Sequence, residues 1–334
     1  MADRAPAQQL VTVFGGSGFV GRHVVRALVK RGYRVRVAVR RPDLANFLQP
    51  LGIVGQIHAV QANLRYPASV AAAVKGADAV VNLVGIMQQA GRQSFSSVQA
   101  NGASAVAQAC AAAGIQRLVH VSALGADAGS RSGYARSKAE GEAAVLASVP
   151  GAVLLRPSVM FGPEDSFFNR FASMARMLPV LPLVGDGVTK FQPAFVGDVA
   201  EAVARAVDGT VAGGRTYELG GPEVLSLRKI VEEICKVTGR KPLLVPMPFP
   251  LAKLAGRVLE VVDSLTLGLI PDELVMTSDQ AILLQSDNVV STQAKAEGRD
   301  FAGLGIAPTS VEAVVSSYLW RFRKTGQFDT ARAN

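Results

Sequence analysis

The chain has few residues of the types that hold disulfide-linked or metal-dependent folds together. It contains only two cysteines among 334 residues, and both Cys110 and Cys235 fall within helical patterns. A disulfide scaffold is therefore excluded, and we expect two buried, reduced thiols. The three histidines, His23, His58 and His120, lie among apolar neighbours without the spacing of metal ligands. We expect no metal site.

Long uninterrupted apolar runs are also missing, although 49% of the residues are hydrophobic. The most apolar late segment, 249–270, carries four charges on one helical face, at Lys253, Arg257, Glu260 and Asp263. It predicts an amphipathic helix rather than a membrane span. The first strand begins close to the N-terminus, which leaves no room for a signal or transit peptide. We expect a cytoplasmic protein, peripheral at the inner membrane if it docks there, or a matrix-side protein whose presequence was removed.

The balance of charge favours some partners and excludes others. No run of lysine and arginine is interleaved with aromatic residues, so we expect no binding to nucleic acid. The formal net charge of +9 favours anionic partners, which include a phosphate-rich cofactor, an acidic protein surface and anionic lipid.

Glycine, in contrast, is present at a defined spacing near the N-terminus. Apolar residues at 11–14 lead directly into Gly15, Gly18 and Gly21, and a helical pattern at 20–31 follows. This strand–turn–helix places a dinucleotide pyrophosphate on the N-terminus of a helix. The first glycine permits the tight turn, the second lets backbone amides approach the phosphates, and the third allows the helix to pack close to the strand. A simple glycine turn is the alternative, and the surrounding strand and helix favour the dinucleotide site.

Strand and helix patterns alternate after this motif. Alternation at this spacing predicts an α/β fold, a doubly wound parallel Rossmann sheet of about seven strands, with a small C-terminal α/β lobe. We expect an NAD(P)-binding domain at residues 8–160 and a C-terminal part at 161–330 that completes the sheet and forms the lobe. The expected strands are 34–39, 57–61, 79–84, 117–122 and 215–219, and the expected helices include 67–75, 97–113, 167–177, 226–237 and 309–323.

The second strand indicates which dinucleotide is bound. It ends at Arg40 and Arg41, where an NAD-binding chain would carry an acid for the ribose hydroxyls, and Arg22 follows the glycine motif. Guanidinium groups suit a 2′-phosphate, so the pattern favours NADP(H) over NAD. The alternative is a solvated basic edge. Asn63 and Leu64 stand where a turn would contact the adenine.

Tyr134 and Lys138 are candidate catalytic residues. They are four residues apart in a helical pattern and therefore share one face, so the ammonium can lower the phenol pKa and reach the ribose. Ser122, at the end of the fifth strand, could donate to a substrate carbonyl. Together they predict a Ser/Tyr/Lys set in which the tyrosine is the acid–base group. The alternative is a chance pair on an exposed helix.

With these motifs in this order, the chain resembles the extended and atypical short-chain dehydrogenase/reductases, the NAD-dependent epimerase/dehydratase-like proteins. The segments 154–163 and 191–198 strengthen the resemblance, and Asp198 is expected to cap the helix that follows it. The resemblance implies that 154–163 is the sixth strand and the loop over the nicotinamide. The residues expected to line the cofactor are Gly15, Ser17, Gly18, Phe19, Val20, Gly21, Arg22, Arg40, Arg41, Asn63, Leu64, Val84, Gly85, Tyr134, Lys138, Pro157 and Ser158.

One subgroup is more similar. Residues 161–174 and 279–290 resemble the accessory nucleotide-binding subunits of respiratory complex I and their bacterial relatives. This resemblance implies that NADPH is held tightly as a structural cofactor, and that the protein docks on complex I subunits near the quinone site and the membrane surface. Such subunits retain the tyrosine and lysine without demonstrable turnover. The alternative is a free-standing NADPH-dependent reductase or epimerase that uses Tyr134, Lys138 and Ser122.

Two apolar clusters near the C-terminus leave their roles open. Phenylalanines and methionines at 167–177 have helical spacing, which favours core packing over a pocket for a hydrophobic substrate such as a quinone. The segment 318–324 combines aromatic and basic residues at the end of the last expected helix. Its cations suit a helix C-terminus, and the alternative is a patch that touches a membrane or a partner subunit.

Overall fold

The computed structural model of the chain describes residues 5–265 and 277–324, and the side chains of all of these except 259–265. The chain divides into two compact units, and it passes from one to the other several times. The first comprises the residues up to Pro157, together with Val196–Leu219 and Ser291–Ala307. The second comprises Ser158–Phe195, Gly220–Val290 and the residues from Pro308 onward.

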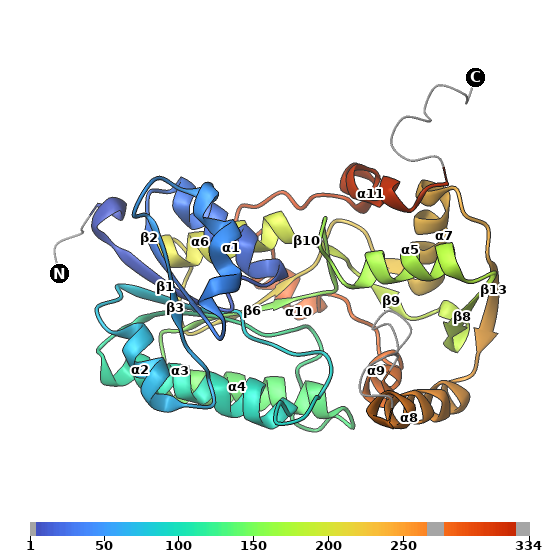
Figure 1. The fold of residues 1–334 in the computed structure, drawn as a ribbon, viewed down its shortest axis with the longest axis horizontal. Coiled ribbons are helices and arrows are strands. Elements are labelled where there is room, and N and C mark those ends of the chain that lie inside the picture. The colour runs from blue at the N-terminus through green and yellow to red at the C-terminus, as the bar shows by residue number, and fades with distance from the viewer. Residues whose placement is uncertain (1–4, 266–276, 325–334) are drawn as a thin grey trace, which may run out of the picture. The chain divides into compact units, whose positions relative to one another are not determined.

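The first unit is built on one parallel sheet of seven strands (Figure 1). Every neighbouring pair is parallel, which confirms the predicted doubly wound sheet. In spatial order the strands are β11 (Thr216–Leu219), β6 (Val153–Pro157), β5 (Arg117–Val121), β4 (Ala79–Asn82), β1 (Leu10–Phe14), β2 (Arg34–Val39) and β3 (Ile57–Gln61).

Helices cover both faces of this sheet, and Figure 1 shows them as two layers. One layer contains α1 (Phe19–Lys30) and α6 (Val196–Asp208), and the other contains α2 (Pro67–Val74), α3 (Asn101–Ala112) and α4 (Gly133–Ser148). Because both faces are covered, the central strands are mostly apolar, and all four residues of β4 are buried. Shorter elements are a 3₁₀ turn at Pro6–Gln8, a 3₁₀ segment at Pro42–Leu51, a π turn at Ser96–Ala100 and α10 (Thr292–Ala296).

An ionic network joins the two helices of the first layer. The Arg31 guanidinium donates to Glu201 Oε1 at 2.7 Å and to Asp208 Oδ2 at 2.8 Å. The Tyr33 hydroxyl donates to the other oxygen of Asp208 at 2.8 Å. Burial, together with the hydrogen bond to Asp208, raises the pKa of Tyr33 to about 12. The tyrosine therefore remains a hydrogen-bond donor at any physiological pH.

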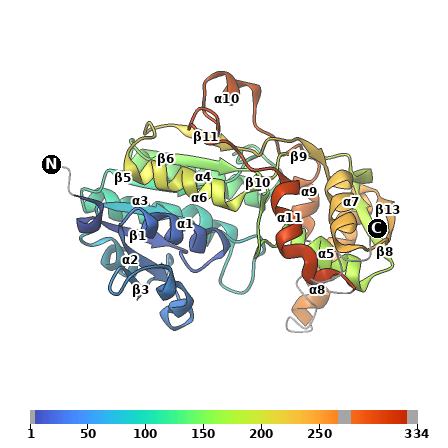
Figure 2. The ribbon, with the colours of Figure 1, turned by 90° about the horizontal axis from the view of Figure 1, so that it is seen from above.

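The second unit contains short strands in pairs and several helices around its own apolar core. Figure 2 shows α5, α7 and α11 grouped together in this unit. Its strand pairs are β7 (Met160–Phe161) with β10 (Ala194–Phe195), β9 (Lys190–Phe191) with β12 (Leu225–Ser226), and β8 (Val180–Val184) with β13 (Leu243–Met247). Its helices are α5 (Phe167–Met177), α7 (Leu227–Thr238), α8 (Phe249–Leu265), α9 (Ser278–Leu283) and α11 (Val311–Leu319), followed by a 3₁₀ turn at Trp320–Phe322.

The segment 284–290 gives the second unit much of its cohesion. The Asn288 side-chain oxygen accepts from the Ser158 hydroxyl at 2.7 Å and from the Val159 amide at 3.1 Å. Gln192 bridges the Gly221 carbonyl at 2.7 Å and the Val290 amide at 3.0 Å. These side chains complete backbone hydrogen bonding that the two-residue strands cannot complete alone. The similarity noted in the sequence at 279–290 thus falls partly on a structural clasp.

Most helices of the second unit begin where the sequence predicts. Helix α5 has the predicted bounds, and α7 has Ser226 as its N-cap, with the hydroxyl accepting from the Lys229 amide at 3.2 Å. Phe168 is fully buried, and Phe167, Phe171 and Met174 pack against the same core. The core interpretation of this cluster is therefore favoured. The predicted helix at 249–270 is present as α8, and the remainder of that prediction lies outside the described residues.

Two details of the sequence predictions are wrong. Asp198 lies in the first turn of α6 rather than at its N-cap, because the helix begins two residues earlier at the buried Val196. Cys235 is only partly buried, whereas Cys110 is fully buried; both are free thiols. Burial raises the pKa of Cys110 to about 12, so that thiol is inert at neutral pH.

The aromatic residues at 318–324, for which a docking patch was the alternative interpretation, mostly face inward. Tyr318 and Phe322 are 5% and 8% exposed and belong to the core of the second unit. The Tyr318 hydroxyl donates to Asp165 Oδ2 at 2.8 Å. Arg321 and Arg323 donate to groups of the same unit, at Asn169 and Val237. These two arginines therefore tie the last helical segment to α5 and α7, and the patch interpretation fails for these aromatics.

No helix within residues 5–265 and 277–324 is long and apolar enough to cross a membrane.

Candidate functional site

The glycine loop joins β1 to α1 in a conformation that only glycine suits. Gly15 has a φ of 78°, its amide donates to the Ala38 carbonyl at 3.2 Å, and its carbonyl accepts from the Gly18 amide at 3.0 Å. A Cβ on Gly21 would stand 2.2 Å from the Gly15 carbonyl oxygen. The helix therefore begins in direct contact with the loop, as the sequence predicts.

The N-terminus of α1 is arranged to receive an anion. Gly18 is its N-cap and offers no side-chain hydrogen bond, and no acidic residue lies in the first turn. The first amides of a helix have no intrahelical partner, so those of Phe19, Val20 and Gly21 remain to be satisfied from outside. Gly18 is exposed, and a Cβ there would meet only the Gly15 oxygen, at 3.3 Å. Ser17, in the same loop, is half-buried.

The arginines expected at the 2′-phosphate lie at the end of β2 and are exposed. Arg40 donates to Gln93 Oε1 at 2.6 Å, and Arg41 donates to Asp43 at 2.9 Å. The pairing with Arg41 lowers the pKa of Asp43. The Arg22 guanidinium lies over the Phe47 ring, 5.0 Å from its centroid. The two exposed guanidinium groups keep further N–H donors available, because arginine carries five.

The segments that follow β4 and β3 also contain residues expected to line the cofactor. A Cβ on Gly15 would stand 3.2 Å from Val84, so the segment after β4 passes directly over the glycine turn. Leu64, after β3, is buried against Gly102 of α3. Asn63 accepts from the Arg65 amide at 3.1 Å and so stabilises its own turn. The expected contacts of these two residues with a cofactor stay predictions.

Ser122 and Lys138 come together at the carboxyl end of β5. The Lys138 ammonium is 5% exposed and donates to the Val121 carbonyl at 3.3 Å. It lies 6.0 Å from the centroid of the Tyr134 ring, and a Cβ on Gly85 would stand 3.3 Å from it. The Ser122 hydroxyl is buried without a hydrogen-bond partner among the described residues. A buried hydroxyl without a hydrogen-bond partner among the described residues, together with an ammonium that still has donors to spare at the same strand end, fits a site completed by a ligand.

Burial controls the protonation of this cluster. It lowers the pKa of Lys138 to about 8, while the nearby Glu142 acts in the opposite direction. Burial also lowers the pKa of His120 to about 3, with a smaller contribution from the Lys138 charge. The His120 ring is held by Asn82, 3.2 Å from Nδ1. Since the Asn82 oxygen accepts from the Val84 amide, its amide group donates to Nδ1, which leaves a neutral ring with its proton on Nε2.

Tyr134 is supported from the side by the segment after β4. The Phe95 ring packs edge-on against it, with centroids 5.9 Å apart. Gln99 accepts from the Ser137 hydroxyl at 2.7 Å and donates to the Ile86 carbonyl at 2.6 Å. These contacts fix the first turn of α4 against the segment that follows β4. Sequence reasoning missed all of them, because they depend on tertiary packing.

The remaining predicted residues fall in different units. Pro157 ends β6 in the first unit, and its carbonyl accepts from the Leu124 amide at 2.9 Å. Ser158 begins the second unit and holds Asn288 as described above. Their expected contacts with the nicotinamide stay predictions.

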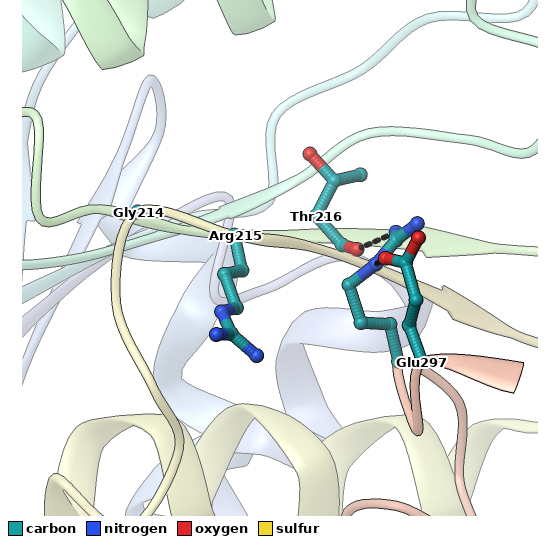
Figure 3. Close-up of a pocket in the computed structure, with 5 residues that line it drawn as sticks. Gly214, Arg215, Thr216 and Glu297 are labelled. Atoms are coloured by element: carbon teal, nitrogen blue, oxygen red, sulfur yellow. Dashed lines mark hydrogen bonds and ion pairs between the residues drawn. The ribbon is translucent and has the colours of Figure 1, made fainter. Parts of the chain in front are cut away.

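One pocket lies at the opposite, β11 edge of the sheet, with a volume of about 630 Å³ (Figure 3). Its lining residues are Gly214, Arg215, Thr216, Glu297 and Arg299. The Arg299 guanidinium donates to the Thr216 carbonyl and to Glu297, both at 2.6 Å. None of the lining residues belongs to the predicted site. Among the described residues, no cluster of three or more histidine, cysteine or acidic side chains could hold a metal ion.

Comparison of the sequence with known proteins identifies the family of the chain. The sequence model of the NAD dependent epimerase/dehydratase family matches residues 11–220, from the glycine loop past the last strand of the sheet. The chain belongs to this family. The expectation of a nicotinamide dinucleotide is thereby confirmed at the level of NAD(P), and so is the resemblance to the extended short-chain dehydrogenase/reductases.

Individual relatives include both respiratory subunits and enzymes. NADH dehydrogenase (ubiquinone) 1 alpha subcomplex subunit 9 of Arabidopsis thaliana, a mitochondrial protein, is 34% identical over 322 residues, which cover 95% of this chain and 79% of the relative. Ceramide reductase of Caulobacter vibrioides is 34% identical over 267 residues, which cover 78% and 80%. The structure of an NADPH-dependent quinone oxidoreductase from Escherichia coli with NADPH has a TM-score of 0.69 at 20% identity, covering 92% and 98%. The last likeness confirms the fold alone.

A further ion pair near the site, between a buried carboxylate and a half-buried guanidinium, was not predicted. The Arg156 guanidinium of β6 donates to both oxygens of Glu142, at 2.8 Å and 2.5 Å. Glu142 lies one helical turn after Lys138 on α4 and is 6% exposed. The spacing of Tyr134, Lys138 and Glu142 on one helix face is the signal in the sequence that could have indicated it.

Proposed function

We propose that the chain is an accessory subunit of the respiratory NADH:quinone oxidoreductase, complex I, and that it holds NADPH as a structural cofactor. The observation that carries this proposal is the 34% identity to a complex I subunit over 95% of the chain. That similarity continues well beyond residue 220, where the family match ends. It therefore includes most of the second unit, where a docking function would need specific surfaces.

The choice of NADPH is supported by the end of β2. Arg40 and Arg41 are exposed there and keep N–H donors available, and Asp43, the nearby acid, is already paired with Arg41. Guanidinium forks favour a 2′-phosphate, whereas NAD requires an acceptor for the ribose hydroxyls. The glycine loop and the α1 amides would hold the pyrophosphate, and Lys138 would donate to the nicotinamide ribose.

The second unit offers a surface for docking. Helix α8 exposes Leu251, Leu254 and Val258, at 52%, 60% and 53%. Spacings of three and four residues place them on one face, and Lys253 and Arg257 lie in the same stretch. Exposed large apolar side chains gathered on a helix face are typical of interaction surfaces. We propose that this face contacts complex I at the inner membrane, on its cytoplasmic side or on the matrix side in a mitochondrion.

Native electrophoresis of gently solubilised membranes tests the proposal. An antibody or mass spectrometry would locate the chain, and extraction with alkali, in which the reduced nicotinamide is stable, would measure NADPH in the same band. We expect the chain and NADPH to co-migrate with complex I subunits, and a Leu254→Ser variant to leave that band while retaining NADPH. Migration of the wild-type chain solely as a free species would contradict complex I membership.

A free-standing reductase is the second candidate, because Ser122 keeps a buried hydroxyl without a partner and a ceramide reductase is among the relatives. In that case the Tyr134 phenol gives its proton to a carbonyl oxygen, and Ser122 donates a hydrogen bond to the same oxygen. The Lys138 ammonium lowers the phenol pKa. A bound NADPH supplies the hydride.

The tyrosine separates the two candidates. Tyr134→Phe removes the proton donor and leaves the ring against Phe95, so a reductase would lose turnover while its NADPH affinity changes little. Turnover of a ketone substrate that persists unchanged in Tyr134→Phe would exclude this residue from the chemistry. If the cofactor is structural, the variant should assemble into complex I like the wild type.

A further inference from the structure

Three charged side chains, Lys138, Glu142 and Arg156, come from α4 and β6 at the candidate site. Lys138 and Glu142 are one turn apart on the buried face of α4, at 5% and 6% exposure. Arg156 of β6 holds both oxygens of Glu142 in a bidentate pair. Two forked hydrogen bonds fix the plane of the carboxylate, so its position relative to Lys138 is set by the sheet rather than by a flexible side chain.

The pair could be explained simply as a tie between α4 and β6, but the position of Lys138 favours a second effect. An isolated buried ammonium is unstable unless an opposite charge lies nearby. Lys138 has one hydrogen-bond acceptor among the described residues, the neutral Val121 carbonyl. The other groups around it, the Tyr134 phenol and the neutral His120 ring, supply no negative charge. Glu142 is the acid whose charge acts on it.

Other charges act on the far side of the pair. Asp127 and Glu218 lie near Arg156 and favour its charged form, in addition to Glu142. The hydrogen bonds to Glu142 raise the pKa of Arg156, so Arg156 stays a cation clamped on both carboxylate oxygens of Glu142. The charges follow one another in the order Arg156, Glu142 and Lys138, and the Lys138 ammonium faces the space beside Gly85.

We infer that Glu142 is a positioning residue, whose carboxylate, clamped by Arg156, holds Lys138 as an ammonium facing the cofactor ribose. This inference rests on the proposed binding of NADPH. Without Glu142 the lysine would deprotonate at a lower pH and lose the charge and the donor with which it binds the ribose. The pair thus sets the upper pH limit of cofactor binding rather than the shape of the site.

The direct test is the titration of Lys138 in the full-length protein labelled with ¹³Cε-lysine, whose chemical shift reports protonation of Nζ. Lys138→Met assigns the signal. We expect Glu142→Gln to lower the Lys138 midpoint by at least about one pH unit, the lower range for an opposite charge in contact. Glu140→Gln is the matched control, since Glu140 is exposed on the same helix and its loss should leave the midpoint unchanged.

NADPH binding gives the second readout. Between pH 6 and 9, the loss of affinity with rising pH should move downward in Glu142→Gln, with about fivefold weaker binding at pH 8 for a one-unit shift. Because Glu142→Gln leaves Arg156 unpaired, a double variant, Glu142→Met with Arg156→Met, removes both charges and restores apolar packing. It should show the same lowered midpoint.

The outcomes separate this inference from the proposed function. An unchanged Lys138 midpoint in folded Glu142→Gln or in the double variant would overturn the inference. If the midpoint falls but Lys138→Met binds NADPH like the wild type, the lysine does not hold the cofactor, and the proposed ribose contact fails instead.

Discussion

Replacing Gly21 by alanine tests the close approach of α1 to the glycine loop. The new Cβ would lie 2.2 Å from the Gly15 carbonyl oxygen and 2.6 Å from two backbone atoms of Gly16. Backbone atoms cannot move aside as a side-chain tip can, so the cost is near the upper end of about 1–3 kcal/mol for overpacking. Alanine regains about 1 kcal/mol through its helix propensity. The expected net loss of unfolding free energy is about 2 kcal/mol.

Urea denaturation followed by circular dichroism measures this loss. With an m-value of about 3 kcal/mol/M, the midpoint of the first unit should fall by about 0.7 M. Gly151→Ala is the control, because a Cβ at that position meets nothing within 4 Å and its φ is not positive. If Gly21→Ala unfolds at the wild-type urea concentration, the contact does not exclude a side chain, and our explanation of the third glycine is wrong.

In contrast to Gly21→Ala, the substitution Gly18→Ala should reduce stability little and should weaken cofactor binding. The Gly18 backbone is extended, and its Cβ would meet only one atom, at 3.3 Å. Loss of stability should therefore stay below about 1 kcal/mol, the effect of alanine at an N-cap. The methyl group would project toward the helix amides that we assign to the pyrophosphate. NADPH affinity should fall at least about tenfold, equivalent to 1.4 kcal/mol, and unchanged affinity would move the phosphate site away from Gly18.

Three further predictions concern the cofactor, the second unit and pH. Arg40→Ala should weaken NADPH binding by roughly tenfold and NADH binding much less. This loss is consistent with about 1.5–3 kcal/mol for a hydrogen bond to a charged group. Fluorescence titrations with both dinucleotides measure it, and equal effects on the two would show that Arg40 does not contact the 2′-phosphate. Tyr318→Phe should cost about 1–3 kcal/mol in urea denaturation, because the buried Asp165 loses a donor, and a loss below 0.5 kcal/mol (about the scale of a surface change) would contradict this. Since the folded pKa of His120 is about 3 and the unfolded value is near 6.5, the unfolded chain binds the extra proton and stability falls as pH drops through 6.5 toward 3. His120→Gln should be less sensitive to acid in that range, and an identical pH profile would show that the ring is not held neutral.

The sheet could be predicted closely from the sequence, and the reasons are physical. The segment 34–39 alternates between polar and apolar residues as a strand does, and both 34–39 and 57–61 were predicted with their observed bounds. The glycine loop was equally recognisable, because Gly15 needs a positive φ and Gly21 leaves no room for a Cβ. The tertiary pairs were not predictable, because Arg156 and Glu142, or Ser158 and Asn288, become neighbours only after folding.

The errors of detail have a common origin. Residues 318–324 have the composition of a surface patch, yet a single buried acid, Asp165, draws the Tyr318 hydroxyl into the core. Burial raises the pKa of that carboxyl, while the hydrogen bonds from Tyr318 and from backbone amides oppose the rise. Likewise, α6 begins at the buried Val196 rather than after Asp198. The Asp198 carboxylate lies in the first turn, where its negative charge interacts favourably with the positive end of the helix dipole.

The outer edge of β11, an edge strand of the sheet, is covered by residues near 299, which are synthesised late. The Glu218 amide donates to the Arg299 carbonyl at 2.8 Å, and the Arg299 side chain satisfies the Thr216 carbonyl. These contacts occupy the outer edge of β11, which would otherwise be open to pairing with another strand. During synthesis the first unit can form its strands early, but its edge stays uncovered until residue 299 has emerged. Completion of the nucleotide-binding unit is therefore a late event in the life of the nascent chain, and a chain interrupted within the second unit carries an unprotected sheet edge.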